Sequence, residues 1–239
     1  MHDFSDKVAL VTGASRGLGY AIAQALAAAG AHVILVARTQ GALEELYDSI
    51  TAQGGSATGC PMDLTDATMI DELGATIAER WGKLDMLVGN AGVLGVLTPV
   101  SHIAAGEFDK ALAINLTANA HLIRVCEPLL LKADAPRALF LTSGAADKAR
   151  PFWGLYAATK AALNALVQTW ANEHKGDALR VNLLSPGPTR TAMRAQAMPG
   201  EDPNTLPSPA AIAPLALTLL SPHHAHTGEI VRYDENFRG

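Results

Sequence analysis

The chain has 239 residues, of which 49% are apolar, 17% are charged and 44 are alanine. Its 18 Lys and Arg residues against 23 Asp and Glu residues leave a net charge of −5, so the composition argues against binding to nucleic acid or to an anionic membrane. The length and apolar content exclude a disordered chain and a small disulfide scaffold, and they fit one large α/β domain.

The two cysteines, Cys60 and Cys126, form neither a ligand cluster nor a disulfide framework. The first residues lack the charged-then-apolar order of a signal peptide, and the apolar runs are too short to span a bilayer. We therefore expect a cytoplasmic protein with reduced thiols.

Short β-branched runs alternate along the chain with longer Ala- and Leu-rich stretches of helical period. Strands are predicted over residues 8–12, 32–37, 56–60, 86–89, 138–142, 180–184 and 229–233. Helices are predicted over residues 18–29, 41–52, 67–80, 107–131, 153–173 and 210–220, with Thr39, Asp66 and Ser208 as N-caps of three of them. The alternation predicts a Rossmann-type, doubly wound parallel sheet of seven strands with helices on both faces, in a single domain over residues 1–239.

Residues 189–207 interrupt this alternation. Pro199, Gly200, Pro203 and Pro207 break regular elements there. Because so long a segment between elements of a compact domain is often functional, we expect a substrate lid. The alternative is a mobile surface loop.

Three glycines, Gly13, Gly17 and Gly19, follow the first strand and open the first helix. Glycines at such a turn let the backbone approach a pyrophosphate, and the free N–H groups of the helix start bind anions. The alternative is a tight connection without a ligand. With its pattern T-G-x-x-x-G-x-G, the chain resembles the short-chain dehydrogenase/reductase family. The resemblance implies that a nicotinamide dinucleotide contacts the loop residues Gly13, Ser15, Arg16, Gly17, Leu18 and Gly19.

Arg38 ends the second strand, where NAD-binding folds usually carry an acidic residue. A guanidinium at this point offers a charged fork to a 2′-phosphate, and Arg16 is near enough to assist it. The sequence therefore favours NADP(H) over NAD(H), unless Arg38 only solvates the strand end.

Later motifs extend the resemblance over essentially the whole chain. The sequence segments 185–193 and 227–230 are similar to those of an uncharacterised bacterial branch of the family, the YciK-type oxidoreductases. Gly89 stands where the family's commonest motif has a further asparagine, so we expect a strand-stabilising hydrogen bond to be missing. The resemblance implies further cofactor contacts from Asp63, Leu64, Asn90, Ala91, Gly92, Pro186, Gly187, Thr189 and Thr191.

Tyr156 and Lys160 are four residues apart and share one face of a predicted helix. Ser143 ends a strand 13 residues before Tyr156, and Asn115 lies in the long helix. The resemblance implies that these four residues are catalytic, that Tyr156 and Lys160 also contact the cofactor, and that Asn115 holds a water that relays protons to Lys160. A cation near ~4 Å in a medium of dielectric constant ~20 favours a phenolate by about 4 kcal/mol, so Lys160 is expected to lower the pKa of Tyr156.

The sequence therefore predicts an NADP(H)-dependent oxidoreductase that interconverts a ketone or aldehyde and an alcohol, with Tyr156 as general acid and base. One alternative is a 3-oxoacyl-[acyl-carrier-protein] reductase, with Arg150, Arg190 and Arg194 facing an acidic carrier. Another is a noncatalytic NADP sensor or scaffold. We expect an apolar substrate pocket formed by Leu94, Phe152, Trp153 and Met193.

Residues 156–171 are predicted to form a helix that is apolar nearly all round, which favours burial against a second subunit. The alternative is that alanine is present simply as a good helix former. The resemblance implies a homodimer or homotetramer, and the C-terminal residues 233–239 depart from the family's glycine-rich ending, which favours the dimer. We expect no metal at His223, His224 and His226, because no carboxylate or cysteine stands at ligand spacing.

Overall fold

The computed structural model describes residues 2–233. Seven parallel strands form one sheet in the order β3-β2-β1-β4-β5-β6-β7. The strands are β1 (Val8–Thr12), β2 (His32–Ala37), β3 (Ser56–Pro61), β4 (Met86–Gly89), β5 (Arg137–Leu141), β6 (Arg180–Ser185) and β7 (Ile230–Arg232). These bounds differ from the sequence prediction by at most one residue at either end, and the predicted fold class is confirmed.

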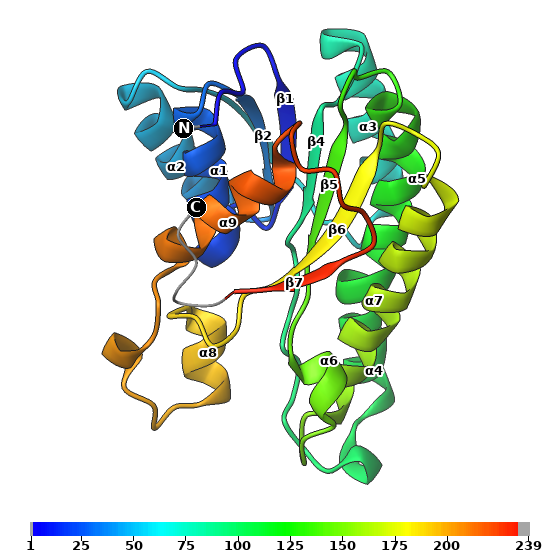
Figure 1. Cartoon of the computed structure of the whole chain (residues 1–239). Helices are drawn as coiled ribbons and strands as arrows, with labels where there is room; N and C mark the ends of the chain where they lie inside the picture. Colours follow the sequence, from blue (N-terminus) through cyan, green and yellow to red (C-terminus); the bar gives the residue numbers. More distant parts are fainter. Residues whose placement is uncertain (1, 234–239) are drawn as a thin grey trace.

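Helices cover both faces of the sheet (Figure 1). On one face lie α1 (Gly17–Ala28), α2 (Gln40–Ala52) and α9 (Pro209–Leu220), and on the other α3 (Ala67–Trp81), α5 (Ala118–Leu130) and α7 (Gly154–Glu173). Each layer encloses its own apolar core, centred on residues such as Ile22 and Leu35 on the first face and Phe140 and Leu163 on the second. Because helices cover both sides of the sheet, the central strands β1, β2 and β4 are almost wholly buried and apolar, which helps to account for the low charged fraction of the chain.

Asp66 and Ser208 cap their helices as predicted, since their side chains accept hydrogen bonds from the backbone N–H groups of the first turn. Thr39 precedes α2 in an extended conformation but makes no such side-chain bond. Thr39 thus occupies the predicted N-cap position without the capping hydrogen bond that the other two residues make.

The predicted helix over 107–131 has three parts. It begins as α4 (Ala105–Leu112), widens into a π-helical turn (Ala113–Thr117) and continues as α5. Such a turn holds one extra residue and is frequent at functional sites. It contains Asn115, whose side chain is held by neighbouring elements, so tertiary contacts interrupt the regular period here.

The segment over 189–207 is more regular than predicted. It contains α8 (Ala192–Ala197) and a single 3-10 turn (Pro203–Thr205). Thr191 caps α8, because its hydroxyl accepts a hydrogen bond from the N–H of Arg194 at 3.2 Å. The prolines flank this helix and do not enter it, which is why they do not prevent it.

Two further short elements are a 3-10 turn (Val100–His102) and α6 (Ala145–Lys148). Within residues 2–233, none of the helices is both long enough and apolar enough to cross a membrane. The same residues contain no group of three or more side chains that could hold a metal ion.

Candidate active site

A cavity of about 330 Å³ opens at the carboxyl ends of β4, β5 and β6. Parallel α/β sheets bind ligands at this edge, near the point where the strand order reverses. Here the reversal falls between β1 and β4, because the chain leaves β1 first toward β2 and later returns to β4 on its other side. The fold therefore brings residues from both halves of the chain to one site.

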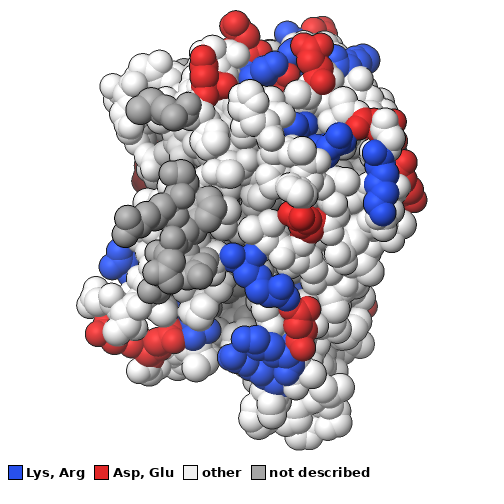
Figure 2. All heavy atoms as spheres, in the orientation of Figure 1, with Lys and Arg blue, Asp and Glu red and all other residues white. Residues whose placement is uncertain are grey.

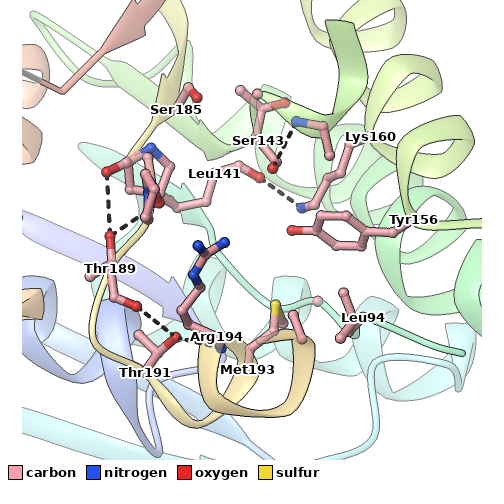
Figure 3. A pocket seen from close by; sticks show the side chains of 18 of the residues that line it. Leu94, Leu141, Ser143, Tyr156, Lys160, Ser185, Thr189, Thr191, Met193 and Arg194 are labelled. Carbon is pink, nitrogen blue, oxygen red and sulfur yellow. Dashed lines mark hydrogen bonds between the residues drawn. The ribbon is translucent and has the colours of Figure 1, made fainter. Parts of the chain in front are cut away.

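Tyr156 and Lys160 come from the first turns of α7, and Ser143 from the loop after β5 (Figure 3). All three line the cavity. The hydroxyl of Tyr156 points into it, while the Lys160 ammonium donates a hydrogen bond to the carbonyl oxygen of Leu141 at 2.8 Å. Ser143 accepts a hydrogen bond from the Ala145 N–H at 3.1 Å, which orients its side chain.

Burial shifts both titratable groups of this pair toward their neutral forms. It raises the pKa of Tyr156 to about 12, against the opposing effect of a hydrogen bond with Ser143, and it lowers the pKa of Lys160 to about 8. The expectation that Lys160 lowers the pKa of Tyr156 below its ordinary value is therefore not met. The physical reason is that the ammonium is bonded to Leu141 and lies 5.9 Å from the centre of the Tyr156 ring, while both residues are at least 90% buried.

Asn115 is fully buried in the π-helical turn. Its side-chain oxygen accepts a hydrogen bond from the Val93 N–H at 2.8 Å, and its amide donates to the Val93 carbonyl at 2.9 Å and to the Thr159 hydroxyl at 3.0 Å. The side chain therefore joins the loop after β4 to α7, and both N–H groups of its amide are used in these bonds. A Cβ atom on Gly92 would lie only 3.2 Å from the Asn115 oxygen and 3.5 Å from the Lys160 nitrogen, so glycine keeps this corner of the cavity open.

The glycine loop connects β1 to α1. Gly13 and Gly17 have φ values of +64° and +63°, which only glycine adopts without strain. A Cβ atom on Gly13 would lie 2.8 Å from the Asn90 amide nitrogen, and one on Gly19 would collide with the Gly13 carbonyl oxygen. Asn90 itself donates to the carbonyl oxygens of Thr12 at 2.9 Å and Gly13 at 3.1 Å, so it positions the loop from β4.

Arg38 follows β2 directly and is exposed, as is Arg16 in the glycine loop. The loop lies beside the end of β2, because the Ala14 N–H donates to the Val36 carbonyl oxygen at 3.1 Å. Asp63, after β3, accepts hydrogen bonds from the N–H and hydroxyl of Thr65, and these bonds together with the charge of Arg38 lower the pKa of Asp63. This edge thus presents two guanidinium groups in the region where the fold binds an adenosine ribose.

The turn after β6 closes the site. Gly187 has φ +69°, and the Thr189 hydroxyl donates to the carbonyl oxygens of Pro186 and Gly187 at 3.3 Å each. The Thr191 hydroxyl donates in turn to the Thr189 carbonyl at 3.3 Å, and a Cβ atom on Gly17 would touch the Thr191 methyl at 3.5 Å. The segment after the turn therefore lies directly beside the glycine loop.

The predicted site residues fall into two sets. Many line the cavity, namely Leu18, Asn90, Gly92, Leu94, Ser143, Trp153, Tyr156, Lys160, Pro186, Gly187, Thr189, Thr191 and Met193. Others lie beyond its lining, namely Gly13, Ser15, Arg16, Gly17, Gly19, Arg38, Asp63, Leu64, Ala91 and Asn115. Phe152, predicted to line the substrate pocket, lies outside the lining as well, and its side chain is 57% exposed.

Lys148 and Arg232 also line the cavity, although neither belongs to a predicted motif. Lys148 ends the short α6 and Arg232 lies in β7. Their only signal in the sequence is their position close to the carboxyl ends of strands, which many surface residues share.

A family model described as short chain dehydrogenase matches residues 7–202. The chain belongs to this family. It is 38% identical over 219 residues to the uncharacterised oxidoreductase YciK of Escherichia coli (strain K12), an alignment that covers 90% of this chain and 86% of that protein. The predicted family and its YciK-type branch are confirmed.

Two solved structures show the same similarity over nearly the whole fold. A short chain dehydrogenase from Shigella flexneri 2a str. 301, complexed with NADP, matches with a TM-score of 0.93 and 36% identity, covering 97% of this chain and 99% of that chain. Another from Escherichia coli CFT073, complexed with NADPH, matches with a TM-score of 0.92 and 36% identity, covering 96% of this chain and 97% of that chain.

Proposed function

We propose that this protein is an NADP(H)-dependent oxidoreductase that interconverts a ketone or aldehyde and the corresponding alcohol. The observation that carries the proposal is the convergence of Ser143, Tyr156 and Lys160 in one cavity, on the edge of the sheet that also carries the glycine loop. A proton donor, a polar group for the carbonyl oxygen and a buried cation are the groups that carbonyl reduction requires.

The residues at the nucleotide end fit NADP(H). Gly13 and Gly19 leave a cradle that a Cβ atom would fill, so backbone N–H groups at the start of α1 can approach a pyrophosphate. Arg38 stands at the end of β2 in place of a carboxylate, and a guanidinium binds a 2′-phosphate where a carboxylate would bind ribose hydroxyls. The two similar structures that carry NADP and NADPH support the same cofactor.

The bound cofactor would supply or accept the hydride. The side chains of the cavity would donate or accept the proton and would stabilise the negative charge that develops on oxygen. At neutral pH Tyr156 holds its proton, since burial raises its pKa to about 12, and it can donate that proton to the carbonyl oxygen as negative charge develops there. Lys160, with a pKa of about 8, is mostly protonated at pH 7, so its charge would stabilise the phenolate that remains. Ser143 would orient the carbonyl oxygen beside Tyr156.

A panel of ketones, aldehydes and acyl thioesters tested for NADPH oxidation would identify the activity. We expect Tyr156→Phe to lower kcat by roughly 100-fold or more, because a positioned general acid contributes about 10²- to 10⁴-fold. NADPH binding should persist in this variant. Tyr47→Phe is the matched control, since Tyr47 is 43% exposed on α2.

The same experiment separates the alternatives. Turnover confined to thioesters of an acyl carrier protein would identify a 3-oxoacyl-[acyl-carrier-protein] reductase. NADPH binding without any turnover would indicate a sensor or scaffold. Full activity in Tyr156→Phe would refute the proposed proton donor.

A further inference from the structure

Basic side chains gather at the cavity, although the chain as a whole is acidic. Lys148, Arg150, Lys160, Arg194 and Arg232 line it, and among its described lining residues there is no Asp or Glu. The chain has 18 Lys and Arg residues against 23 Asp and Glu residues, so this lining is strongly biased in charge. Figure 2 shows several Lys and Arg side chains around the hollow that lies between α8 and α6.

Three of these five cations already have partners. Lys160 donates to the Leu141 carbonyl oxygen. Arg194 makes two hydrogen bonds of 2.5 Å to the carboxylate of Glu201, and Arg232 lies 2.7 Å from that of Asp147.

Lys148 and Arg150 are the two other cations of the cavity lining. Within residues 2–233, neither has a carboxylate within 4.0 Å, and both are exposed at the cavity mouth. Among the described residues, they are therefore the two exposed cations of the lining that can bind an anionic ligand without giving up a hydrogen bond or an ion pair.

The backbone around these two residues is unusual. Ala149 and Phe152 have φ values of +39° and +71°, a region that residues with a Cβ atom seldom adopt. The turn is closed by a hydrogen bond from the Trp153 N–H to the Arg150 carbonyl, and it is tied to the loop after β4 by a bond from the Thr98 N–H to the Phe152 carbonyl. Strain of this kind, of order 1–3 kcal/mol per residue, persists where neighbouring structure enforces it, and it often marks a ligand site.

The interior behind this mouth is apolar. Leu94, Ala145 and Tyr156 form a buried cluster, against which Leu97, Trp153, Met193 and Ala197 pack. A ligand that reaches the Tyr156 hydroxyl must therefore pass apolar side chains, while its outer end lies beside Lys148 and Arg150.

We propose that the substrate is a carbonyl compound with an apolar body and an anionic group, a carboxylate or a phosphate, at the end remote from the carbonyl, and that Lys148 and Arg150 bind this group. That the substrate carries a carbonyl group rests on the proposed oxidoreductase function, but the anion site itself can be tested without turnover.

Binding is measured on the protein saturated with NADP⁺, so that the cofactor's own phosphate sites are filled. The probes are octanoate, octyl phosphate and octanamide, which share a chain length and differ in charge. Quenching of tryptophan fluorescence reports binding, because Trp153 lines the cavity and packs edge-on to Tyr156 with ring centres 6.2 Å apart. We expect at least one of the two anions to bind about tenfold more tightly than octanamide, as charge-assisted hydrogen bonds imply. Whichever of octanoate and octyl phosphate binds more tightly shows whether the site prefers a carboxylate or a phosphate.

The decisive variant combines Lys148→Met with Arg150→Met. It should bind the anions and octanamide with nearly equal affinity, while its affinity for octanamide is unchanged. The matched control combines Lys132→Met with Lys175→Met, two exposed lysines after α5 and α7 at the opposite edge of the sheet, and it should keep the anion preference. Equal binding of all three probes by the unmodified protein, or a preference that survives the double variant, overturns the proposal.

Turnover is then compared for 9-oxononanoate and its methyl ester. We expect kcat/KM to be about tenfold higher for the acid, and the difference to shrink at high salt and in the Lys148→Met, Arg150→Met protein. Selective anion binding without oxidation of NADPH by any carbonyl compound would contradict the proposed function and leave the anion site standing. Equal turnover of acid and ester together with equal binding of all three probes would contradict the anion site and leave the proposed function standing.

Discussion

The two halves of the site are built in different ways. On the side of the proposed nucleotide site, β1 to β3, which we call the nucleotide side, the geometry depends on glycines. Gly13 and Gly17 adopt positive φ values, and a Cβ atom on Gly19 would collide with the backbone. On the side of the proposed catalytic residues, β4 to β7, which we call the catalytic side, the geometry depends on buried polar side chains. Asn115 is bonded to Val93 and Thr159, and Lys160 to Leu141.

This difference has an energetic consequence. Exposed arginines and an open glycine turn contribute little to folding, so the nucleotide side can change its ligand preference at small expense in stability. Buried polar groups lose several hydrogen bonds at once when one partner is removed, so the catalytic side couples function to folding. Four substitutions test the contrast, ordered by their expected effect on the free energy of unfolding.

Asn115→Ala should have the largest effect. It removes three hydrogen bonds of a fully buried side chain and leaves the N–H and carbonyl of Val93 without their partner. We expect the free energy of unfolding to fall by about 3 kcal/mol, measured by urea denaturation. Asn172→Ala, at an exposed position near the end of α7, is the control. A loss below about 1 kcal/mol would contradict the view that the catalytic side is held by buried polar bonds.

Lys160→Met should change the pH dependence of stability. Burial lowers the pKa of Lys160 from 10.5 to about 8, so between these values the unfolded chain binds a proton that the folded chain lacks. The stability of the unmodified protein relative to the variant should therefore rise with pH, by about 2 kcal/mol between pH 8 and pH 9.5. Below pH 8 the penalty for burying the charge is fully present. A flat difference across this range would show that folding does not lower the pKa of Lys160.

Gly17→Ala and Gly82→Ala form a matched pair on the question of the glycine loop. Both glycines have positive φ, +63° and +72°, and a Cβ atom on either meets nothing closer than 3.5 Å. Each variant should lose about 1 kcal/mol of stability from backbone strain alone. Only Gly17→Ala should weaken NADPH binding, because Gly82 ends α3 away from the cavity. Equal affinity of the two variants for NADPH would show that the glycine loop does not contact the cofactor.

Arg38→Gln should have the smallest effect on stability, below about 0.5 kcal/mol, because the side chain is exposed. The dissociation constant of NADPH should nevertheless rise about tenfold and that of NADH stay constant, since only NADPH carries the 2′-phosphate. Arg124→Gln, at an exposed arginine on α5, is the control. An unchanged NADPH to NADH ratio would exclude Arg38 as the phosphate ligand.

Part of the site could be predicted because the relevant signals are local. The spacing of Tyr156 and Lys160 places both on one face of a regular helix, and the strand–glycine–helix order requires only a short stretch of chain. The π-helical turn at Asn115 has no such signal, because it depends on Val93 and Thr159, which lie far away in the sequence. The same holds for Lys148 and Arg232, which reach the cavity from separate strand ends.

By itself, the sequence determined the fold class, the glycine turn, the arginine at the end of β2 and the identity of the residues around Tyr156, since alternating periods and short motifs act within one or two elements. The tertiary structure decided the protonation and the charge of the site. Burial sets the pKa values of Tyr156 and Lys160, and the pairing of Arg194 with Glu201 and of Arg232 with Asp147 determines which cations face a ligand. The physical reason is that desolvation and ion pairing depend on which distant residues surround a group, and no local pattern records them.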